Sequence, residues 1–386
     1  MRVKLKDIFD LQMGKTPSRS NLEYWNTTDY KWISIADLTK TSKYIFETKE
    51  YLSKSAIKDS GIKVIPANTV VMSFKLSIGK TAITKEDMYS NEAIMAFKDK
   101  HVINILPEYI FYLFKYKNWE EGSNKAVMGK TLNKATLSEI EVEICSIEKQ
   151  RQIVSILDKI MSSVDGRKQE LQLLDELIKV RFVEMFGDPV ANDKGWKMKP
   201  LLDMGKCKNG MNFHYDDSGV EISCLGVGDF KDLSVIDNTK KLSIVSLNEM
   251  PSEEYLLKDG DIVFVRSNGN KDLVGRSLAI YPGKLPTTFS GFCIRYRIHD
   301  DEITVPYLLR VLKMESMRKK MAGRGANIQN LNQQILGTLV IPVPPIELQN
   351  QFVDFVRAID KSKVAVQKAL DETQILFDSL MQKYFG

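Results

Sequence analysis

Residues able to contact a polyanion gather in two loops of the second half of the chain. Residues 266–271 (RSNGNK) follow a β-type run and mix cations with side-chain amides. Residues 321–330 (MAGRGANIQN) repeat this chemistry beside glycines that allow close backbone approach. Arg and Lys favour the O6/N7 edge of guanine, whereas Asn and Gln favour the N6/N7 edge of adenine. This composition is typical of loops that read DNA bases, and ordinary polar surface loops are the alternative.

The first half contains counterpart loops at residues 73–80 and 125–133. Each contains a Gly-Lys pair, and a lysine beside a glycine turn can contact DNA phosphate. The candidate DNA contacts from both halves are Lys75, Lys80, Lys125, Lys130, Arg266, Asn268, Asn270, Lys271, Arg276, Arg324, Asn327 and Gln329. Asn133 and Asn332 stand at matched positions of the two halves, so a turn or a helix cap is the better interpretation for them.

The other polar residues form no recognisable catalytic motif. Gly-Lys-Thr occurs at 14–16, 79–81 and 129–131, but the first glycine of a P-loop is replaced by Phe9, Phe74 and Asn124. The Pro-Pro pair at 344–345 lacks the acid or amide and the aromatic residue that hold a flipped base for amino-methylation. Three histidines and four widely spaced cysteines show no metal-ligand spacing, and the cysteines are interpreted as buried reduced thiols. The sequence predicts no catalytic residue, no metal site and no cofactor site in this chain.

The elements that must position these loops occur twice. Residues 132–154 (LNKATLSEIEVEICSIEKQRQIV) return without a gap as residues 331–353 (LNQQILGTLVIPVPPIELQNQFV), an offset of 199 residues. The register still holds at Phe186-Gly187 and Phe385-Gly386. The period is too long for a solenoid, so the sequence predicts two copies of one unit, a globular part followed by a helix.

Residues 147–186 and 346–385 are predicted to form two long helices. Apolar residues alternate at spacings of three and four and make one stripe along each helix. The predicted seam consists of Leu157, Ile160, Val164, Leu171, Leu174, Ile178, Val356, Ile359, Val366, Leu370, Phe377 and Leu380. At ~1.5 Å per residue, each helix would make a spacer of roughly 60 Å.

Polar residues interrupt the two seams at different places. The gaps are Arg167 and Arg181 in the first helix and Lys363 and Thr373 in the second. A homodimeric zipper would align like gaps with like. We therefore expect antiparallel pairing within one chain, in which apolar residues of the partner helix cover the gaps.

Each globular part is predicted to be an α+β domain. Its β-type runs and one short apolar helix pattern occur in both halves, and the glycine turns Gly79-Lys80-Thr81 and Gly275-Arg276-Ser277 match as well. The predicted strands lie at 30–35, 69–74, 92–97, 220–227, 261–267 and 292–298, and the predicted helices at 107–115 and 305–313.

This organisation, with two helices that open on Ile-Glu-x-Gln-x-Gln, resembles the specificity subunit of type I restriction–modification enzymes. The resemblance covers the whole chain and is carried by residues 136–187 and 335–386, above all by IPVPPIELQNQFV and the final Phe-Gly. The first copy departs from the pattern, because residues 143–146 (EICS) lack the prolines. The resemblance implies target-recognition domains and spacer helices that pair as an antiparallel coiled coil. The domains would span 1–145 and 188–345, and the helices 146–187 and 346–386.

The resemblance further implies a non-catalytic subunit that reads a split target in double-stranded DNA, one half for each domain. Two methyltransferase subunits would dock on the helices and supply S-adenosylmethionine, and two motor and restriction subunits would use ATP and Mg. Two alternatives from other classes stay open. One is a stand-alone DNA methyltransferase or nuclease, and the other is a coiled-coil scaffold without a DNA role.

Composition agrees with a globular protein and adds little about partners. The chain is 43% hydrophobic and 27% charged, and its formal net charge of +5 is compatible with a polyanion partner. No apolar run reaches the length of a membrane span, and the N-terminus lacks the apolar core of a signal peptide. These features predict a cytoplasmic protein with no membrane partner.

Overall fold

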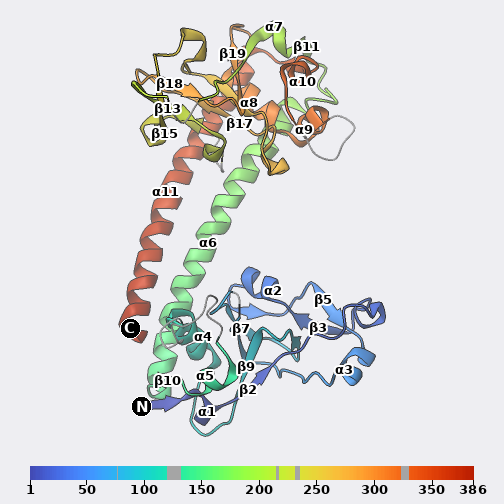
Figure 1. The fold of residues 1–386 in the computed structure, drawn as a ribbon, viewed down its shortest axis with the longest axis vertical. Helices are drawn as coiled ribbons and strands as arrows, with labels where there is room; N and C mark the ends of the chain where they lie inside the picture. Colours follow the sequence, from blue (N-terminus) through green and yellow to red (C-terminus); the bar gives the residue numbers. More distant parts are fainter. Residues whose placement is uncertain (76, 120–131, 214–216, 231–234, 323–329) are drawn as a thin grey trace. The chain divides into compact units, whose positions relative to one another are not determined.

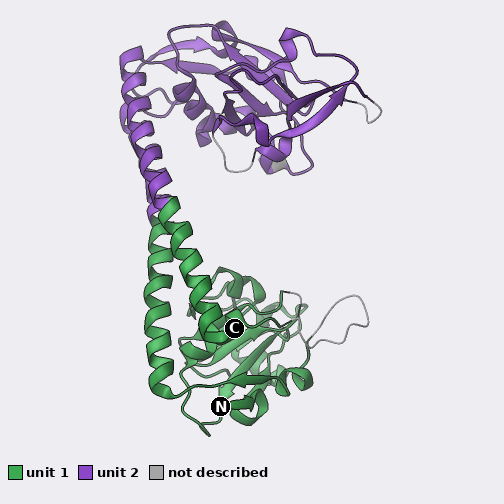
Figure 2. Ribbon diagram, turned by 90° about the vertical axis from the view of Figure 1, so that its left-hand side faces the viewer, with its two compact units in different colours: residues 1–169, 367–386 green, residues 170–366 purple. Residues whose placement is uncertain are grey.

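The structure is a computed structural model, and it describes residues 1–386 apart from 76, 120–131, 214–216, 231–234 and 323–329. The chain divides into two compact units (Figure 2). Unit 1 consists of Met1–Gln169 together with Gln367–Gly386, and unit 2 consists of Glu170–Val366. Figure 1 labels the helices and strands of both units.

Unit 1 contains short strands and helices before its long helical segments. The strands are β1 (Arg2–Lys4), β2 (Phe9–Met13), β3 (Tyr30–Ile33), β4 (Tyr44–Ile45), β5 (Glu50–Leu52), β6 (Val70–Ser73), β7 (Thr81–Thr84), β8 (Tyr89–Ser90), β9 (Ile94–Asp99) and β10 (Glu141–Glu143). The helices are α1 (Leu5–Ile8), η1 (Leu22–Tyr24), α2 (Ile35–Lys40), α3 (Lys54–Ser60), α4 (Pro107–Tyr116) and α5 (Lys134–Ser138).

Unit 2 repeats this plan. Its strands are β11 (Lys197–Pro200), β12 (Gly205–Asn209), β13 (Val220–Leu225), β14 (Val235–Ile236), β15 (Ser243–Leu247), β16 (Asp261–Val265), β17 (Ser277–Ile280), β18 (Thr287–Phe289), β19 (Cys293–Ile298) and β20 (Val340–Val343). Its helices are α7 (Leu201–Met204), η2 (Val227–Asp229), η3 (Thr239–Lys241), η4 (Glu253–Tyr255), η5 (Lys271–Leu273), α8 (Val305–Lys313), α9 (Glu315–Ala322) and α10 (Gln333–Gly337).

The two units have the same sheet topology. The five-stranded sheet has the order β2-β9-β6-β7-β4 in unit 1 and β12-β19-β16-β17-β14 in unit 2. A three-stranded sheet (β5-β3-β8; β15-β13-β18) and a two-stranded sheet (β1-β10; β11-β20) recur as well. The central pairs are antiparallel, and β4 and β14 join their sheets in parallel. The predicted duplication is therefore confirmed, and every predicted strand and short helix corresponds to an observed one.

Alternation along the central strands explains why each sheet is covered on both faces. In β6, Val70 and Met72 belong to the core that includes α4, whereas Val71 belongs to a separate core on the other face. In β16, Ile262 and Phe264 pack with α8, whereas Val263 and Val265 belong to the second core of unit 2. Side chains of a strand point alternately to opposite faces, so a run of apolar residues here supplies two cores at once.

The two long helices are α6 (Ile147–Phe186) and α11 (Ile346–Phe385). Each begins in one compact unit and ends in the other. All twelve residues of the predicted seam are buried or half-buried. In unit 1, Leu157 and Phe377 share a core, and in unit 2 Phe182 and Phe352 contact edge to face with ring centroids 5.4 Å apart. Within each unit, the two helical segments therefore pack together.

The polar gaps in the seams are filled differently from the prediction. In unit 1, Arg167 donates a hydrogen bond to Thr373, so one gap meets the other. In unit 2, Lys363 pairs with Asp175 at 2.7 Å. Apolar cover was the wrong expectation at these positions, because a half-buried cation is stabilised by hydrogen bonding rather than by apolar contact. Arg181 comes nearer to the expectation, since its guanidinium lies 5.9 Å from the centroid of the Phe355 ring.

The first glutamine of the Ile-Glu-x-Gln-x-Gln pattern fastens each long helix to its own unit. Gln349 is fully buried, and its Nε2 donates to the carbonyls of Glu302 (2.8 Å) and Pro344 (2.9 Å). Its Oε1 accepts from the backbone N–H of Thr304 at 2.8 Å. Gln150 bonds in the same way to the equivalent loop of unit 1, at Asn104 and Leu106. The pattern shared by the two copies thus includes a buried glutamine whose side-chain hydrogen bonds attach the long helix to its unit.

The matched asparagines have the structural role that the sequence predicts. Asn133 caps α5 by accepting from the N–H of Thr136 at 2.9 Å, and Asn332 caps α10 by accepting from Ile335 at 2.8 Å. A side-chain oxygen at this position satisfies a backbone donor that the helix leaves open. Both asparagines therefore belong to the scaffold.

Candidate nucleic-acid interface

A glycine turn connects two central strands in each unit, and a cation follows it. Gly79 and Gly275 have φ values of 86° and 76°, a region that favours glycine. In unit 1 the N–H of Gly79 donates to Ser73, and in unit 2 that of Gly275 donates to Val265, both at 2.9 Å. Lys80 and Arg276 accordingly occupy the same place in the two units, as the matching of the glycine turns predicted.

The predicted contacts of unit 1 lie around this turn. Lys80 is exposed, and Lys75 is half-buried with its Nζ 5.3 Å from the centroid of the Phe74 ring. Packing also favours glycine at position 79, because a Cβ there would lie 3.2 Å from the indole of Trp119. Lys125 and Lys130 lie outside the described residues.

The predicted contacts of unit 2 lie in the corresponding loop, where two asparagines shape the backbone. The Oδ1 of Asn268 accepts from the N–H of Asn270 at 2.7 Å, and the Oδ1 of Asn270 accepts from Asp272 at 3.1 Å. Because both side-chain oxygens accept backbone hydrogen bonds, these asparagines would contact DNA as donors, through their amide N–H groups. The sequence alone did not show whether they would act as donors or as acceptors. Arg266 is held through its backbone, which donates to Phe292 and accepts from Leu331, both at 2.8 Å.

The remaining candidates of unit 2 divide between described and undescribed residues. Lys271 opens the short turn η5, and Arg276 donates through Nε to the carbonyl of Asp272 at 3.3 Å. Arg324, Asn327 and Gln329 lie outside the described residues.

Sequence reasoning missed a second cation in each unit, at the end of α4 and of α8. Burial lowers the pKa of Lys115, and the charges of Lys168 and Lys80 lower it further, whereas Asp165 raises it. Burial, Arg310 and Arg276 lower the pKa of Lys313 to about 8. The signal was present in the sequence, because Lys115 and Lys313 end the two matched helix patterns.

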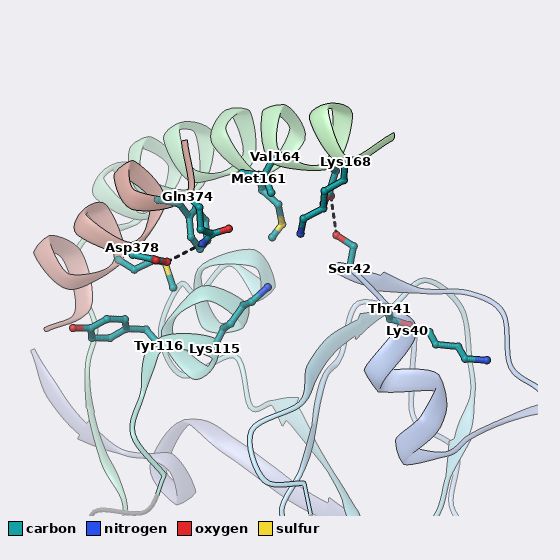
Figure 3. Close-up of a pocket in the computed structure, with 13 residues that line it drawn as sticks. Lys40, Thr41, Ser42, Lys115, Tyr116, Met161, Val164, Lys168, Gln374 and Asp378 are labelled. Atoms are coloured by element: carbon teal, nitrogen blue, oxygen red, sulfur yellow. Dashed lines mark hydrogen bonds between the residues drawn. The ribbon is translucent and has the colours of Figure 1, made fainter. Parts of the chain in front are cut away.

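Lys115 lines a cavity of about 610 Å³ that lies wholly within unit 1 (Figure 3). Lys168 extends into the same cavity from α6, and Lys40 lines its rim at the end of α2. Ser42 and Asp165 are joined across one side by a hydrogen bond of 3.0 Å. The cavity therefore combines three lysines with hydroxyl and carboxylate groups.

The other titratable clusters have structural explanations. Lys4 pairs with Glu139 at 2.8 Å, and together with Lys6 it lowers the pKa of that carboxyl group to about 2. Within the described part of the chain, no three His, Cys, Asp or Glu side chains are grouped as metal ligands. All four cysteines are free thiols, and Cys145 and Cys207 are only half-buried, so the interpretation as buried thiols holds fully for two of them. No helix in the described ranges is long and apolar enough to cross a membrane.

Residues 1–176 and 193–373 match the sequence profile of the type I restriction modification DNA specificity domain. The chain belongs to this family of DNA specificity domains. The MjaIX specificity subunit from Methanocaldococcus jannaschii is 25% identical over 98% of this chain and 91% of its own length. The StySPI specificity subunit from Salmonella potsdam is 24% identical over 92% of this chain and 82% of its own.

Two solved structures share the fold of this specificity-domain protein. The S subunit of a type I restriction–modification system from M. genitalium has a TM-score of 0.54 at 15% identity and covers 100% of this chain and 96% of its own. A chain from work on complex assembly and conformational transition of the type I R-M system has a TM-score of 0.61 at 16% identity, covering 100% and 97%. The α+β architecture with two repeated domains is thus that of type I specificity subunits. The matched domain recognises DNA and is not a catalytic domain.

Proposed function

We propose that this chain is the subunit that gives a type I restriction–modification complex its sequence specificity, by reading a bipartite site in double-stranded DNA. The observation that carries the proposal is the duplicated glycine turn with its cation, set on the same sheet topology in both units. Two copies of one DNA-recognition domain suit a target with two specified halves. The cytoplasm, where that DNA lies, is the proposed location.

Each recognition domain would read one half of the target through its loops. Residues 1–145 and 188–345 are the proposed recognition domains. The arginines, lysines and amide donors of the loops that follow β6 and β16 are the proposed contacts, together with the candidates outside the described residues. Loop side chains would differ between the halves because they face different bases, whereas the caps and buried glutamines stay alike.

The spacer helices, 146–187 and 346–386, would pair as an antiparallel coiled coil and set the distance between the two half-sites. The packing of α6 against α11 within each unit supports this proposal. Two domains that face one side of a duplex read half-sites about one helical turn, roughly 10 bp, apart. Two methyltransferase subunits would dock on these helices and supply S-adenosylmethionine, and two motor and restriction subunits would supply ATP, Mg and cleavage.

Domain exchange in the assembled complex tests the proposal. Residues 1–145 are replaced by the equivalent domain of another specificity subunit, and the genome of a host carrying the complex is sequenced for methylated bases. We expect one half of the methylated motif to change and the other half to persist. A motif that changes in both halves, or in neither, would contradict the proposal.

A further inference from the structure

Two neighbouring residues at the edge of the five-stranded sheet of unit 1 bond to the long helix α6. The hydroxyl of Ser42 donates to Asp165 at 3.0 Å, and the ammonium group of Lys43 pairs with Asp158 at 2.5 Å. The backbone of this segment is fixed to the sheet, because the carbonyl of Lys43 accepts from the N–H of Ile83 at 2.9 Å. The edge of the sheet is therefore attached to α6 at two places, seven residues apart on the helix.

The carboxylate of Asp158 is the centre of this contact. The same oxygen that accepts from Lys43 also accepts from the hydroxyl of Tyr112 on α4, so the sheet edge, α4 and α6 meet at one atom. Burial and this carboxylate raise the pKa of the Tyr112 hydroxyl, which therefore stays protonated and can donate. Only 9% of the Lys43 side chain is exposed, and a charge-assisted hydrogen bond gains strength where water is largely excluded. Together these residues form a polar clamp, which consists of Ser42, Lys43, Tyr112, Asp158 and Asp165.

An open cavity lies next to the polar clamp. The cavity has a volume of about 610 Å³, and it is lined by the turn after α2 and the end of α4 on one side and by α6 and α11 on the other (Figure 3). The hydrogen bond between Ser42 and Asp165 joins its two sides. A cavity holds no packed side chains, so at this place polar contacts rather than apolar packing connect the sheet edge with α6.

The globular part of unit 1, residues 1–145, has a second attachment to the helices that is apolar. The ring of Tyr112 lies 6.3 Å from that of Phe377 on α11, and both residues share a core with Leu157 on α6. Apolar contact is non-directional, whereas a hydrogen bond depends on the directions of donor and acceptor. The apolar attachment alone would let the globular part tilt about α4 into the cavity. The polar clamp holds the sheet edge at a second point and so fixes the angle.

The matched positions of unit 2 do not form this contact. Arg310 on α8 stands in the place of Tyr112, and Arg357 on α11 stands in the place of Asp158. Arg357 pairs with Asp354 of its own helix at 3.4 Å, and the buried Nε of Arg310 has no hydrogen-bond partner within the described residues. Two cations cannot replace a carboxylate and its hydroxyl donor, so the polar clamp distinguishes unit 1 from unit 2.

We propose that the polar clamp holds the first recognition domain at a fixed angle on its spacer helix, so that the complex rejects DNA whose two half-sites are wrongly spaced. The inference rests on the proposed function and adds a second determinant of spacing to the length of the helices. Lys43, Tyr112 and Asp158 are positioning residues, which act through the orientation of the domain. On wrongly spaced DNA the domain must tilt, and the tilt breaks the clamp. The clamp contributes at most the free energy of its own contacts to this rejection, because beyond that the contacts are lost.

Binding of the assembled complex to DNA of altered spacing tests this inference. Affinity is measured for the natural bipartite site and for sites with one base pair more or fewer between the half-sites. We expect Asp158→Ala and Lys43→Met each to lower the ratio of the two affinities about tenfold, the scale of one hydrogen bond to a charged group. The double variant should lose no more than either single variant, because both substitutions remove the same contact. The sequence read in each half-site should stay the same.

Glu139→Ala is the matched control within unit 1. The carboxylate of Glu139 also accepts from two donors, Lys4 at 2.8 Å and Lys6 at 2.5 Å, but all three residues belong to the globular part itself. This variant should leave the ratio of affinities unchanged. Hydrogen exchange of the amides in β6 and β9 should be the same in Asp158→Ala as in wild type, because the core of the domain does not depend on the clamp.

The outcomes separate this inference from the proposed function. A wild-type complex without preference for a bipartite site contradicts the proposed function. If that preference is present, the clamp alone is overturned by a wild type that accepts all three spacings equally, by an unchanged ratio in Asp158→Ala and Lys43→Met, by additive losses in the double variant, or by an equal loss in Glu139→Ala. A lower ratio that comes with faster exchange in β6 and β9 also overturns it, because the residues then serve only the stability of the domain.

Discussion

Replacing the buried glutamine of α11 should loosen the start of that helix from unit 2. Gln349→Leu removes four hydrogen bonds while keeping a side chain of similar size. The N–H of Thr304 and the carbonyl of Pro344 then lose the side-chain amide of Gln349 as their hydrogen-bond partner at the start of α11. A hydrogen bond contributes about 1 kcal/mol net and a buried unpaired group costs about 1–3 kcal/mol. Water can reach Glu302 and Thr304 but not the buried Pro344, so we expect the opening free energy of this region to fall by about 2–4 kcal/mol.

The same motif supplies the control, because its second glutamine, Gln351, is exposed. Gln351→Leu should change stability by no more than about 0.5 kcal/mol. A chain with two compact units need not unfold in a single step, so the measurement should be local. Hydrogen exchange of the amides in α8 and at the start of α11 gives the opening free energy of this region. If Gln349→Leu and Gln351→Leu differ by less than about 0.5 kcal/mol, the reasoning that the buried glutamine fastens the helix is wrong.

Three further outcomes follow from the same geometry. Arg297→Met should destabilise unit 2 by about 3–5 kcal/mol in the same exchange assay, because the buried carboxylate of Asp261 loses the guanidinium that now lies 2.7 Å away. Arg297→Lys keeps a positive charge and should destabilise the unit less. Burial raises the pKa values of the Cys207 and Cys224 thiols to about 12, so at pH 8 both should resist iodoacetamide under native conditions and react after denaturation, as mass spectrometry would record. Inserting one heptad into the helix at 155–185, with a matching heptad in α11, should change the number of unspecified base pairs in the methylated motif, and unchanged spacing would contradict the ruler.

Local patterns in the sequence were enough to predict the duplication, the strands and the long helices. Spacings of three and four define a helix face, and alternation defines a strand, so neither needs knowledge of distant contacts. Asn133 could be assigned as a cap for the same reason, since its partner, Thr136, is three residues away.

The contacts across the fold could not be predicted in this way. The hydrogen bond between Arg167 and Thr373 depends on how two helices align, and the heptad pattern states only that both residues face a seam. Gln150 bonds to Asn104, 46 residues earlier, so its role is invisible in the motif that contains it. Lys115 appears in the sequence as the end of an apolar helix, and only the fold places it in one cavity with Lys168.

The segments that make up the two compact units have a consequence for folding during synthesis of the chain. Unit 2 is one contiguous stretch, whereas unit 1 needs both ends of the chain. Phe377 and Met381 belong to the core of unit 1, and the ring of Phe385 lies 5.4 Å from that of Tyr109. Domains usually fold from the N-terminus as they leave the ribosome. Here the unit that emerges first must wait for the last residues to be made, so the second unit is the first that can finish its core.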